Sequence, residues 1–345
     1  IIDESTMIKS ITTQRYKRMR AIRALCPYRY VLTGTPTPNS LLDIYGQITT
    51  LDDGKALGAT FYHFRTKYFY PSGFGGYEWK IQKDAERAIH KAIQHLVFAL
   101  PKGAGVELPP LVSSTRWVTL PKDVRAVYKK MAAEFVVQLD THEITAANAG
   151  VKSMKLRQIA SGILYVQSSP GQPMATHSDA VYLHEEKLEC LAEICREAAA
   201  PVFVGYQFQA EGLRASKFLT AAGFRVGWLE SGLTTEESSL LLKNWKAGEY
   251  DVLLAHPQVA AHGLNLQAET SMVVWLSPTW NAEHREQFVR RVWRQGQTQT
   301  VSEIHIIAKA TVESVVLKAV HEKTTTQDAL LHALRSHVKE VLSAE

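Results

Sequence analysis

The chain has 345 residues and is 46% hydrophobic, enough to bury two ordinary cores, so we expect two domains. Its formal net charge of +5 permits a polyanionic partner but does not require one. The three cysteines (Cys26, Cys190 and Cys195) form no CxxC pair, which argues against a disulfide framework and gives no sign of a zinc site.

No apolar run approaches membrane-spanning length and no signal peptide is visible, so we expect no membrane partner. Together with the cysteine usage, this favours an intracellular location. The cytoplasm, the nucleoid and a virus-infected host cell all fit, and the nucleus stays open. The sequence identifies no protein partner.

The chain opens with Ile1-Ile2-Asp3-Glu4, an apolar pair that runs directly into two acids without an initiator methionine. We interpret this as the end of a buried strand, and expect the sequence to be a fragment of a longer protein. Parallel α/β sheets carry Mg-nucleotide chemistry at the carboxyl ends of their strands. An aspartate there can hold Mg²⁺ through water, and a neighbouring glutamate can polarise the attacking water. Asp3 and Glu4 are therefore candidate catalytic residues, and Asp3 is the candidate magnesium ligand.

Residues 13–25 are expected to form a helix with its cations scattered around the circumference, which favours a solvated surface. Residues 28–32 are β-prone and lead into Thr33-Gly34-Thr35-Pro36. A hydroxyl-Gly-hydroxyl-Pro turn at a strand end presents backbone N–H and hydroxyl groups to a phosphate or a neighbouring loop.

Residues 51–99 are rich in Tyr, Phe and Lys and broken by glycines, so we expect a helical insertion with a loop, its aromatic side chains in the core. Residues 115–120 are β-prone. Residues 122–139 and 152–161 are expected to be helical, and the Ser/Pro/Gly-rich residues 168–179 to be a surface loop.

A regular pattern begins at Lys187, where a predicted helix over residues 187–198 precedes a series of apolar strands. Helical stretches lie between most of these strands, an alternation that predicts a doubly wound parallel sheet. The predicted strands are residues 202–206, 225–229, 251–255, 272–276 and 303–307.

Residues 284–297, HREQFVRRVWRQGQ, contain no Gly or Pro before Gly296, which predicts a helix ending there in a left-handed C-cap. At about 100° per residue, Gln287, Arg291 and Arg294 fall within roughly 60° of one another. The apolar residues spread over the opposite side and are expected to be buried. A preorganised pair of arginines suits the charge of a phosphoryl-transfer transition state, whereas the alternative is a solvated basic helix. The apolar residues are Phe288, Val289, Val292 and Trp293.

The pattern QxxxRxxRxGQ in this stretch resembles motif VI of the superfamily-two helicases, in the form found in SNF-type, chromatin-remodeller-like DNA translocases. Other segments resemble the family's motifs in the right order: DESTMIKS motif II, LTGTPTPNSLLDIY motif III, VFVGYQFQAE motif IV, LLAHPQVAAHGLNLQ motif V and LSPTWN the element before motif VI. The resemblance covers nearly the whole chain. No GxxxxGK[ST] phosphate-binding loop occurs, and the family places that loop upstream of motif II.

The resemblance implies an α/β fold with two RecA-like lobes built on parallel sheets, the first lobe incomplete, plus helical insertions. The implied segments are residues 1–50 (end of the first lobe, motifs II and III), 51–120 (helical insertion and crossing segment), 121–184 (helical insertion of the second lobe), 185–310 (second lobe, motifs IV to VI) and 311–345 (bracing helices).

The resemblance also implies an ATP-driven translocase on double-stranded DNA that uses ATP and Mg²⁺. ATP would be contacted by Asp3 and Glu4 of the first lobe and by four residues of the second. Phosphate contacts would make DNA binding sequence-tolerant and salt-sensitive. Without the phosphate-binding loop, we expect the chain alone not to turn over ATP. The second-lobe contacts are Gln287, Arg291, Arg294 and Gly263, and the residues implied to couple nucleotide state to DNA are Thr33, Gly34, Thr35, Asn265 and Trp280.

Two alternatives stay open. A strand-separating RNA or DNA helicase of the same superfamily usually has HRxGRxxR or QRxGRxxR as motif VI, which this chain lacks. A catalytically silent nucleic-acid-binding module would explain the missing phosphate-binding loop, but not the presence of both the acidic pair and the arginine pair.

Overall fold

The computed structural model describes residues 1–34, 36–37, 40–72, 78–99, 107–140, 146–165, 180–260 and 264–321. It divides the chain into two compact units, Ile1–Gly105 and Val106–Glu345. The division into five segments expected from the sequence stays a prediction. Among the described residues, no helix combines the length and the apolar character needed to cross a membrane.

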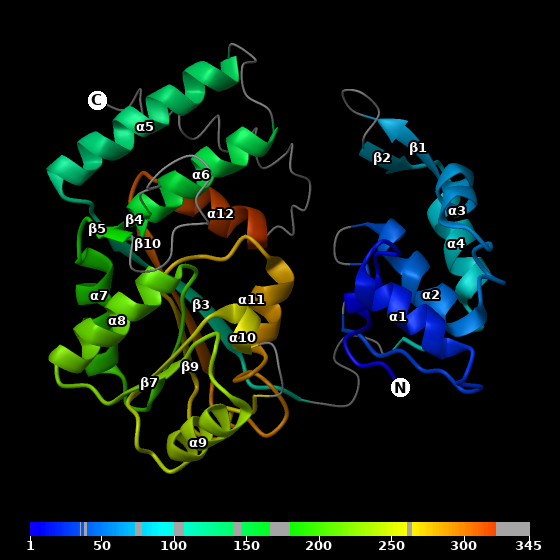
Figure 1. Cartoon of the computed structure of the whole chain (residues 1–345). Helices are drawn as coiled ribbons and strands as arrows, with labels where there is room; N and C mark the ends of the chain where they lie inside the picture. Colours follow the sequence, from blue (N-terminus) through cyan, green and yellow to red (C-terminus); the bar gives the residue numbers. More distant parts are fainter. Residues whose placement is uncertain are drawn as a thin grey trace. The chain divides into compact units, whose positions relative to one another are not determined.

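The first unit is mainly helical (Figure 1). Thr13 caps its first α-helix, because the Thr13 side chain accepts a hydrogen bond from the Tyr16 N–H, as befits the start of the predicted helix. Its elements in order are η1 (Ser5–Ile8), α1 (Gln14–Arg23), η2 (Leu41–Asp43), α2 (Ile44–Asp52), α3 (Phe61–Tyr68), β1 (Phe69–Ser72), β2 (Glu78–Ile81) and α4 (Ala85–Ile93).

The core of the first unit is aromatic, as predicted. Phe64 is fully buried, and its ring lies 5.1 Å from that of Tyr45 and 5.7 Å from that of Phe69, measured between centroids. The expectation of a helical insertion with a loop was incomplete, since β1 and β2 pair as antiparallel strands within it. Pairing β1 with β2 satisfies backbone groups that a loop would leave to water.

The strand predictions near the start of the chain are wrong. Ile2 and Val31 form only an isolated parallel bridge, in which the Leu32 N–H donates to the Ile2 carbonyl at 2.8 Å. Ile1 is 88% exposed, so the first segment is not the buried strand predicted, and residues 28–32 contribute only Val31 to the bridge. The physical reason is that the described part of this unit offers neither segment a second strand neighbour.

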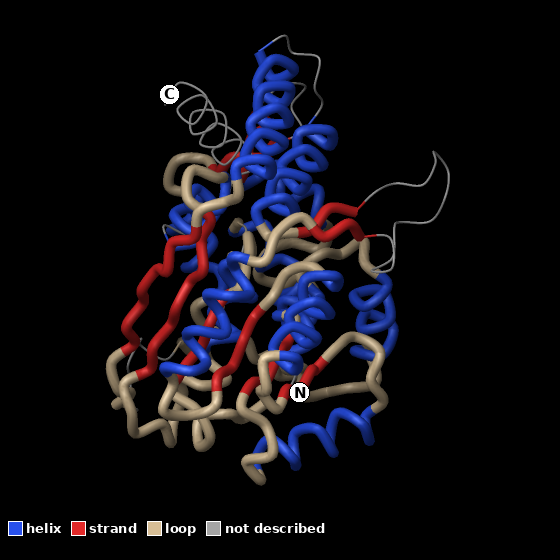
Figure 2. Tube along the Cα trace, turned by 90° about the vertical axis from the view of Figure 1, so that its left-hand side faces the viewer, coloured by secondary structure: helices blue, strands red, loops and turns tan. Residues whose placement is uncertain are grey.

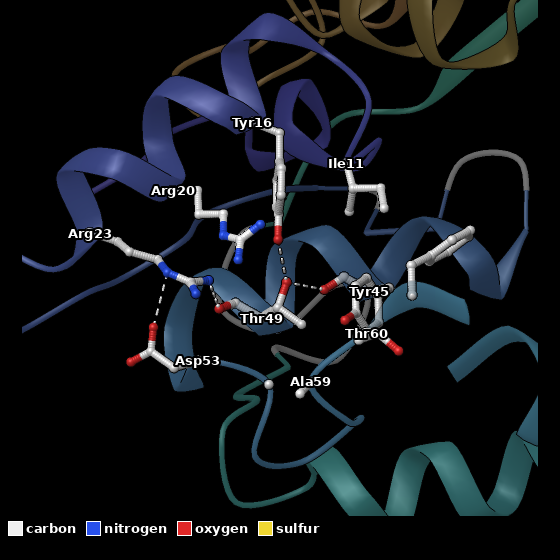
Figure 3. Close-up of a pocket in the computed structure, with 11 residues that line it drawn as sticks. Ile11, Tyr16, Arg20, Arg23, Tyr45, Thr49, Asp53, Ala59 and Thr60 are labelled. Atoms are coloured by element: carbon white, nitrogen blue, oxygen red, sulfur yellow. Dashed lines mark hydrogen bonds and ion pairs between the residues drawn. The ribbon is translucent and has the colours of Figure 1, made fainter. Parts of the chain in front are cut away.

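A cavity of about 250 Å³ lies between α1, α2 and the start of α3 (Figure 3). Two contacts across it join α1 to α2. The hydroxyls of Tyr16 and Thr49 lie 3.0 Å apart, and Arg23 pairs with Asp53 at 3.0 Å. The two contacts hold α1 against α2. None of the candidate residues predicted from the sequence and described by the structure lines the cavity, so the cavity is separate from the predicted catalytic residues.

The second unit is built on a six-stranded sheet of order β3-β10-β9-β6-β8-β7, in which every neighbouring pair is parallel. Its strands are β3 (Leu111–Val118), β6 (Val202–Gly205), β7 (Val226–Leu229), β8 (Val252–Ala255), β9 (Met272–Trp275) and β10 (Val301–Ala308). The five strands predicted beyond Lys187 are confirmed. The strand predicted over residues 115–120 runs instead from Leu111 to Val118 and pairs with β10, so the crossing segment contributes the sixth strand.

Helices cover both faces of this sheet (Figures 1 and 2). Its helices are α5 (Lys122–Asp140), α6 (Ala146–Ala160), α7 (Glu186–Glu197), α8 (Gln209–Ala221), α9 (Thr235–Lys246), α10 (Pro257–Ala260), α11 (Ala282–Val289) and α12 (Val312–His321). A short antiparallel pair, β4 (Ile163–Tyr165) and β5 (Ala180–Tyr182), was not predicted, and the predicted loop over residues 168–179 lies outside the described residues.

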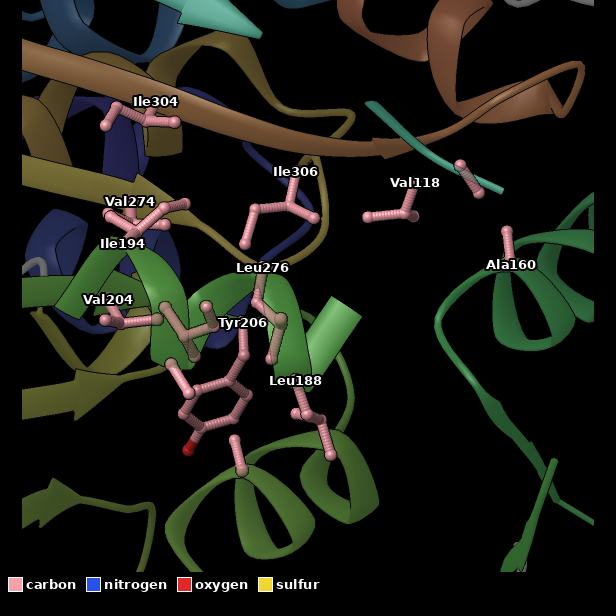
Figure 4. Close-up of a cluster of buried hydrophobic side chains, with 14 of the residues drawn as sticks. Val118, Ala160, Leu188, Ile194, Val204, Tyr206, Val274, Leu276, Ile304 and Ile306 are labelled. Carbon is pink, nitrogen blue, oxygen red and sulfur yellow. The ribbon is translucent and has the colours of Figure 1, made fainter. Parts of the chain in front are cut away.

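The sheet has one hydrophobic cluster on each face, because successive residues of a strand point to opposite faces. Val204 and Val274 belong to the cluster that packs against α5 to α8 and α12, as does Ile306 (Figure 4). Phe203 and Trp275, their neighbours in the chain, belong to the cluster that packs against α9, α10 and α11. The sheet is therefore apolar on both faces, as the continuous hydrophobic runs indicated.

Candidate functional site

The acidic pair lies where the first unit turns from the Ile2–Val31 bridge into η1. Asp3 is exposed, and one of its carboxylate oxygens accepts a hydrogen bond from the Glu4 N–H at 2.9 Å. Glu4 has a φ of 50°, a left-handed conformation that costs a non-glycine residue about 1–2 kcal/mol. The Ser5 N–H donates to the Leu32 carbonyl at 2.9 Å and holds the turn in place. Such strain is characteristic of functional turns.

Gln47 of α2 connects the acidic turn to the segment predicted as motif III. Its side chain is 2% exposed, accepts from the Ser5 hydroxyl at 2.7 Å, and donates to the Pro36 carbonyl at 2.6 Å. Thr33 and Gly34 lie just before Pro36, whereas Thr35 lies outside the described residues. Gln47 was not predicted as a site residue; the available signal was a glutamine between the apolar residues Tyr45 and Ile48 of α2.

The predicted helix over residues 284–296 is wrong beyond Val289, where α11 ends. Tight turns follow, in which the Arg291 N–H donates to the Phe288 carbonyl at 3.1 Å and the Val292 N–H to the Val289 carbonyl at 3.0 Å. The Arg291 carbonyl, which would continue the helix, instead accepts from the Leu266 N–H at 2.9 Å. A tertiary hydrogen bond thus replaces a helical one.

The two-sided character predicted for this stretch is confirmed despite the early helix end. Phe288, Val289 and Val292 are buried, whereas Trp293, also expected to be buried, is half-buried. The Phe288 ring stacks on Phe203 with centroids 4.0 Å apart. Gly296 has a φ of 94°, the left-handed conformation predicted for it, but it closes a turn rather than an α-helix.

The two predicted arginines converge on one segment of the second unit. Arg291 donates to the Leu264 carbonyl at 3.5 Å, and Arg294 donates to the same carbonyl at 3.4 Å. Arg294 also donates to the side-chain oxygen of Asn265. The structure therefore brings together residues predicted separately from motifs V and VI. Gln287 instead donates to Glu283 at 3.3 Å, and Gly263 lies outside the described residues.

Gln297 fixes the end of the segment that carries the two arginines (residues 290–297). It was also not predicted as a site residue. Its side chain is 8% exposed and donates to the carbonyls of Gln267 and Thr270 at 3.1 and 3.0 Å. Its side-chain oxygen accepts from the Gln299 N–H at 2.9 Å. Because both ends of the amide are used, Gln297 fastens this segment to the loop that carries Leu264 and Asn265.

Trp280 and Asn281 precede α11, and Asn281 sets its start. The Asn281 side chain caps the helix by accepting from the Glu283 and His284 N–H groups at 2.9 and 3.2 Å. The Arg157 guanidinium lies 4.9 Å from the centroid of the Trp280 ring, a cation–π contact. Burial lowers the pKa of Arg157 to about 10.

Comparisons with known proteins identify the family of the chain. The model of the SNF2-related domain matches residues 1–174, and that of the Helicase conserved C-terminal domain matches residues 186–296. The C-terminal part of the Fun30 ATPase domain shares the fold, with a TM-score of 0.51 at 12% identity, covering 68% of this chain and 99% of that one.

Three curated relatives are similar over almost the whole chain. "Putative protein p41" of Acyrthosiphon pisum secondary endosymbiont phage 1 is 29% identical, covering 97% of this chain and 72% of that protein. "Uncharacterized ATP-dependent helicase YqhH" of Bacillus subtilis is 22% identical (94% and 58%), and "Chromodomain-helicase-DNA-binding protein 1-like" of Danio rerio is 19% identical (96% and 32%). The chain thus spans about a third of the Danio protein and more than half of the Bacillus one. With its two matched domains and its parallel α/β fold, the chain belongs to the SNF2-related family of helicase-like ATPases.

Proposed function

We propose that the protein containing this chain hydrolyses ATP in order to move along double-stranded DNA. The observation that carries the proposal is the convergence of Arg291 and Arg294 on Leu264, with Asn265 bound to Arg294. Two guanidiniums at a fixed spacing offer planar, forked donors that suit phosphate oxygens. They contact Leu264 and Asn265, and Asn265 is a predicted coupling residue. DNA that displaces Asn265 would therefore change the positions of the arginines during phosphoryl transfer.

In the first unit, Asp3 would hold Mg²⁺ through water and Glu4 would polarise the attacking water. Carboxylate oxygens are the ligands that Mg²⁺ prefers, and Asp3 is exposed with one oxygen already oriented by the Glu4 N–H. Mg²⁺ commonly binds through one or two carboxylates together with waters and substrate phosphates, and a single exposed carboxylate would suit that mode. Gln47 would transmit changes between the acidic turn and Thr33 to Thr35, which we propose as coupling residues.

In the second unit, Arg291 and Arg294 would stabilise charge that develops at the γ-phosphoryl group. Gln287 and Gly263 remain proposed ATP contacts. Asn265 and Trp280 are proposed to report DNA engagement to the arginines, Asn265 through Arg294 directly and Trp280 through the start of α11. An intracellular location, where DNA is accessible, is part of the same proposal.

The test uses the full-length protein and two measurements, ATP turnover and displacement of a triplex-forming strand from duplex DNA. Duplex DNA should stimulate turnover more than single-stranded RNA, and triplex displacement should require ATP. Stimulation by RNA alone would favour the strand-separating helicase. Absence of turnover with any nucleic acid, together with retained DNA binding, would favour the silent binding module.

A further inference from the structure

The orientation of the two arginines depends on how α11 is fixed to the sheet. Both lie beyond the end of α11, in turns that are hydrogen-bonded to its last residues, so their position depends on that of the helix. The buried side of α11 contacts the sheet through aromatic rings, with Phe288 stacked on Phe203 and tilted against Trp275. Apolar contact is non-directional and permits small rotations of a helix. A directional contact is therefore needed to fix its position.

Arg285 supplies that contact. Its guanidinium binds Glu303 of β10 in a forked arrangement, with Nε donating to one carboxylate oxygen at 2.8 Å and Nη2 donating to the other. Glu303 is fully buried, and one of its oxygens also accepts from the Trp275 indole N–H at 2.9 Å. His305 on the same strand lies 3.4 Å from that oxygen. The helix is thus joined to β9 and β10 through a single carboxylate.

We propose that Arg285 and Glu303 are positioning residues that set the orientation of Arg291 and Arg294 for phosphoryl transfer. The inference rests on the proposed function. A forked guanidinium–carboxylate pair fixes both the rotation of α11 and its position along its axis. The segment that follows is held at its other end by Gln297, so displacement of α11 would distort the turns between them. A displacement of about 1 Å at a reacting group can cost on the order of 10²-fold in rate.

The experiment compares R285K with the charge exchange R285E/E303R and its two single variants in the full-length protein. Lysine keeps the charge but loses the fork, so R285K should lower kcat about 10- to 100-fold while the KM for ATP and the affinity for DNA stay within twofold. The double variant should recover at least tenfold in kcat over either single variant. R290K is the matched control, because Arg290 forms an exposed pair with Glu286 at 2.9 Å, and it should keep kcat within twofold.

Hydrogen exchange gives a readout that does not depend on catalysis. The Leu266 amide, bonded to the Arg291 carbonyl, should exchange about tenfold faster in R285K and at an unchanged rate in R290K. Unchanged kcat and unchanged Leu266 exchange in R285K, together with a large kcat loss in R294A, would overturn the positioning role alone. Retained activity in R294A would instead overturn the proposed role of the arginines.

Discussion

Arg291 and Arg294 donate to the same carbonyl oxygen, that of Leu264, at 3.5 and 3.4 Å. Adjacent turns of one segment thereby gather two positive charges beside a loop that is distant in sequence. Arg290, between them and the helix, pairs with Glu286 on the surface instead. The same short stretch thus contains two arginines that contact one carbonyl and a third, Arg290, that does not, so an Arg290 variant can serve as a control for variants of the other two.

Replacing Asn265 with Ala should uncouple DNA binding from ATP turnover. The Asn265 side-chain oxygen accepts from Arg294, so its loss removes the link between the proposed coupling segment and that guanidinium. Stimulation of kcat by duplex DNA should fall about tenfold, the result of losing roughly 1.4 kcal/mol of coupling. The ratio of kcat with and without DNA measures this. The exposed Thr298→Ala variant should keep the ratio, and equal losses in both variants would contradict the assignment.

Replacing Gln47 with Leu should destabilise the first unit. The Ser5 hydroxyl and the Pro36 carbonyl both lose their partner, and the buried Ser5 hydroxyl left unpaired costs about 1–3 kcal/mol. Chemical denaturation followed by a probe in the first unit measures the change. The exposed Gln94 of the same unit is the control, and its Ala variant should stay within about 0.5 kcal/mol of wild type. Equal stability of the two variants would show that Gln47 is not a structural link.

Acidification should weaken the second unit through Glu303. Burial raises the pKa of this carboxyl, but the hydrogen bond and charge of His305 and the Arg285 guanidinium outweigh it and lower the pKa to about 2, from an ordinary 4.5. Because the folded-state pKa is the lower one, the stabilisation is complete above pH 4.5 and disappears as the pH falls towards 2. About 3 kcal/mol of unfolding free energy should be lost over this window, at about 1.4 kcal/mol per pH unit. The E303Q variant should lack this part of the pH dependence, and an identical slope in both proteins would contradict it.

Duplex DNA affinity should fall steeply with salt and vary little with sequence. Phosphate contacts release counterions, so the logarithm of the association constant should decrease linearly with the logarithm of the salt concentration. Fluorescence anisotropy with several unrelated duplexes at three or more salt concentrations measures both properties. A strong preference for one duplex at high salt would indicate base readout instead.

The strands of the second unit could be predicted because their signal is local. Residues such as Val204, Leu254 and Val274 lie in short apolar runs, and full burial on both faces requires such runs. The burial of Phe288 and Val292 followed for the same reason, since both tight turns and helices keep these side chains on one side.

What could not be predicted depends on partners distant in sequence. The Leu266 N–H takes the Arg291 carbonyl, which a longer helix would have used, and no local pattern reveals this. Likewise, β3 belongs to the six-stranded sheet of the second unit because it pairs with β10, a strand distant in sequence. Gln47 and Glu303 acquire their roles only through side chains more than ten residues away, namely Ser5 and Arg285.

The most direct test of the central claim is kcat for duplex-stimulated ATP hydrolysis in three Ala variants of the full-length protein. Arg291→Ala and Arg294→Ala should each lower kcat by about 10³-fold or more, the range typical of arginines that act on phosphoryl transfer. Melting temperature and DNA affinity should stay close to wild type, and Arg290→Ala should keep most activity. Equal losses in all three variants, or a lower melting temperature in Arg291→Ala without a loss of kcat in the folded protein, would contradict the account.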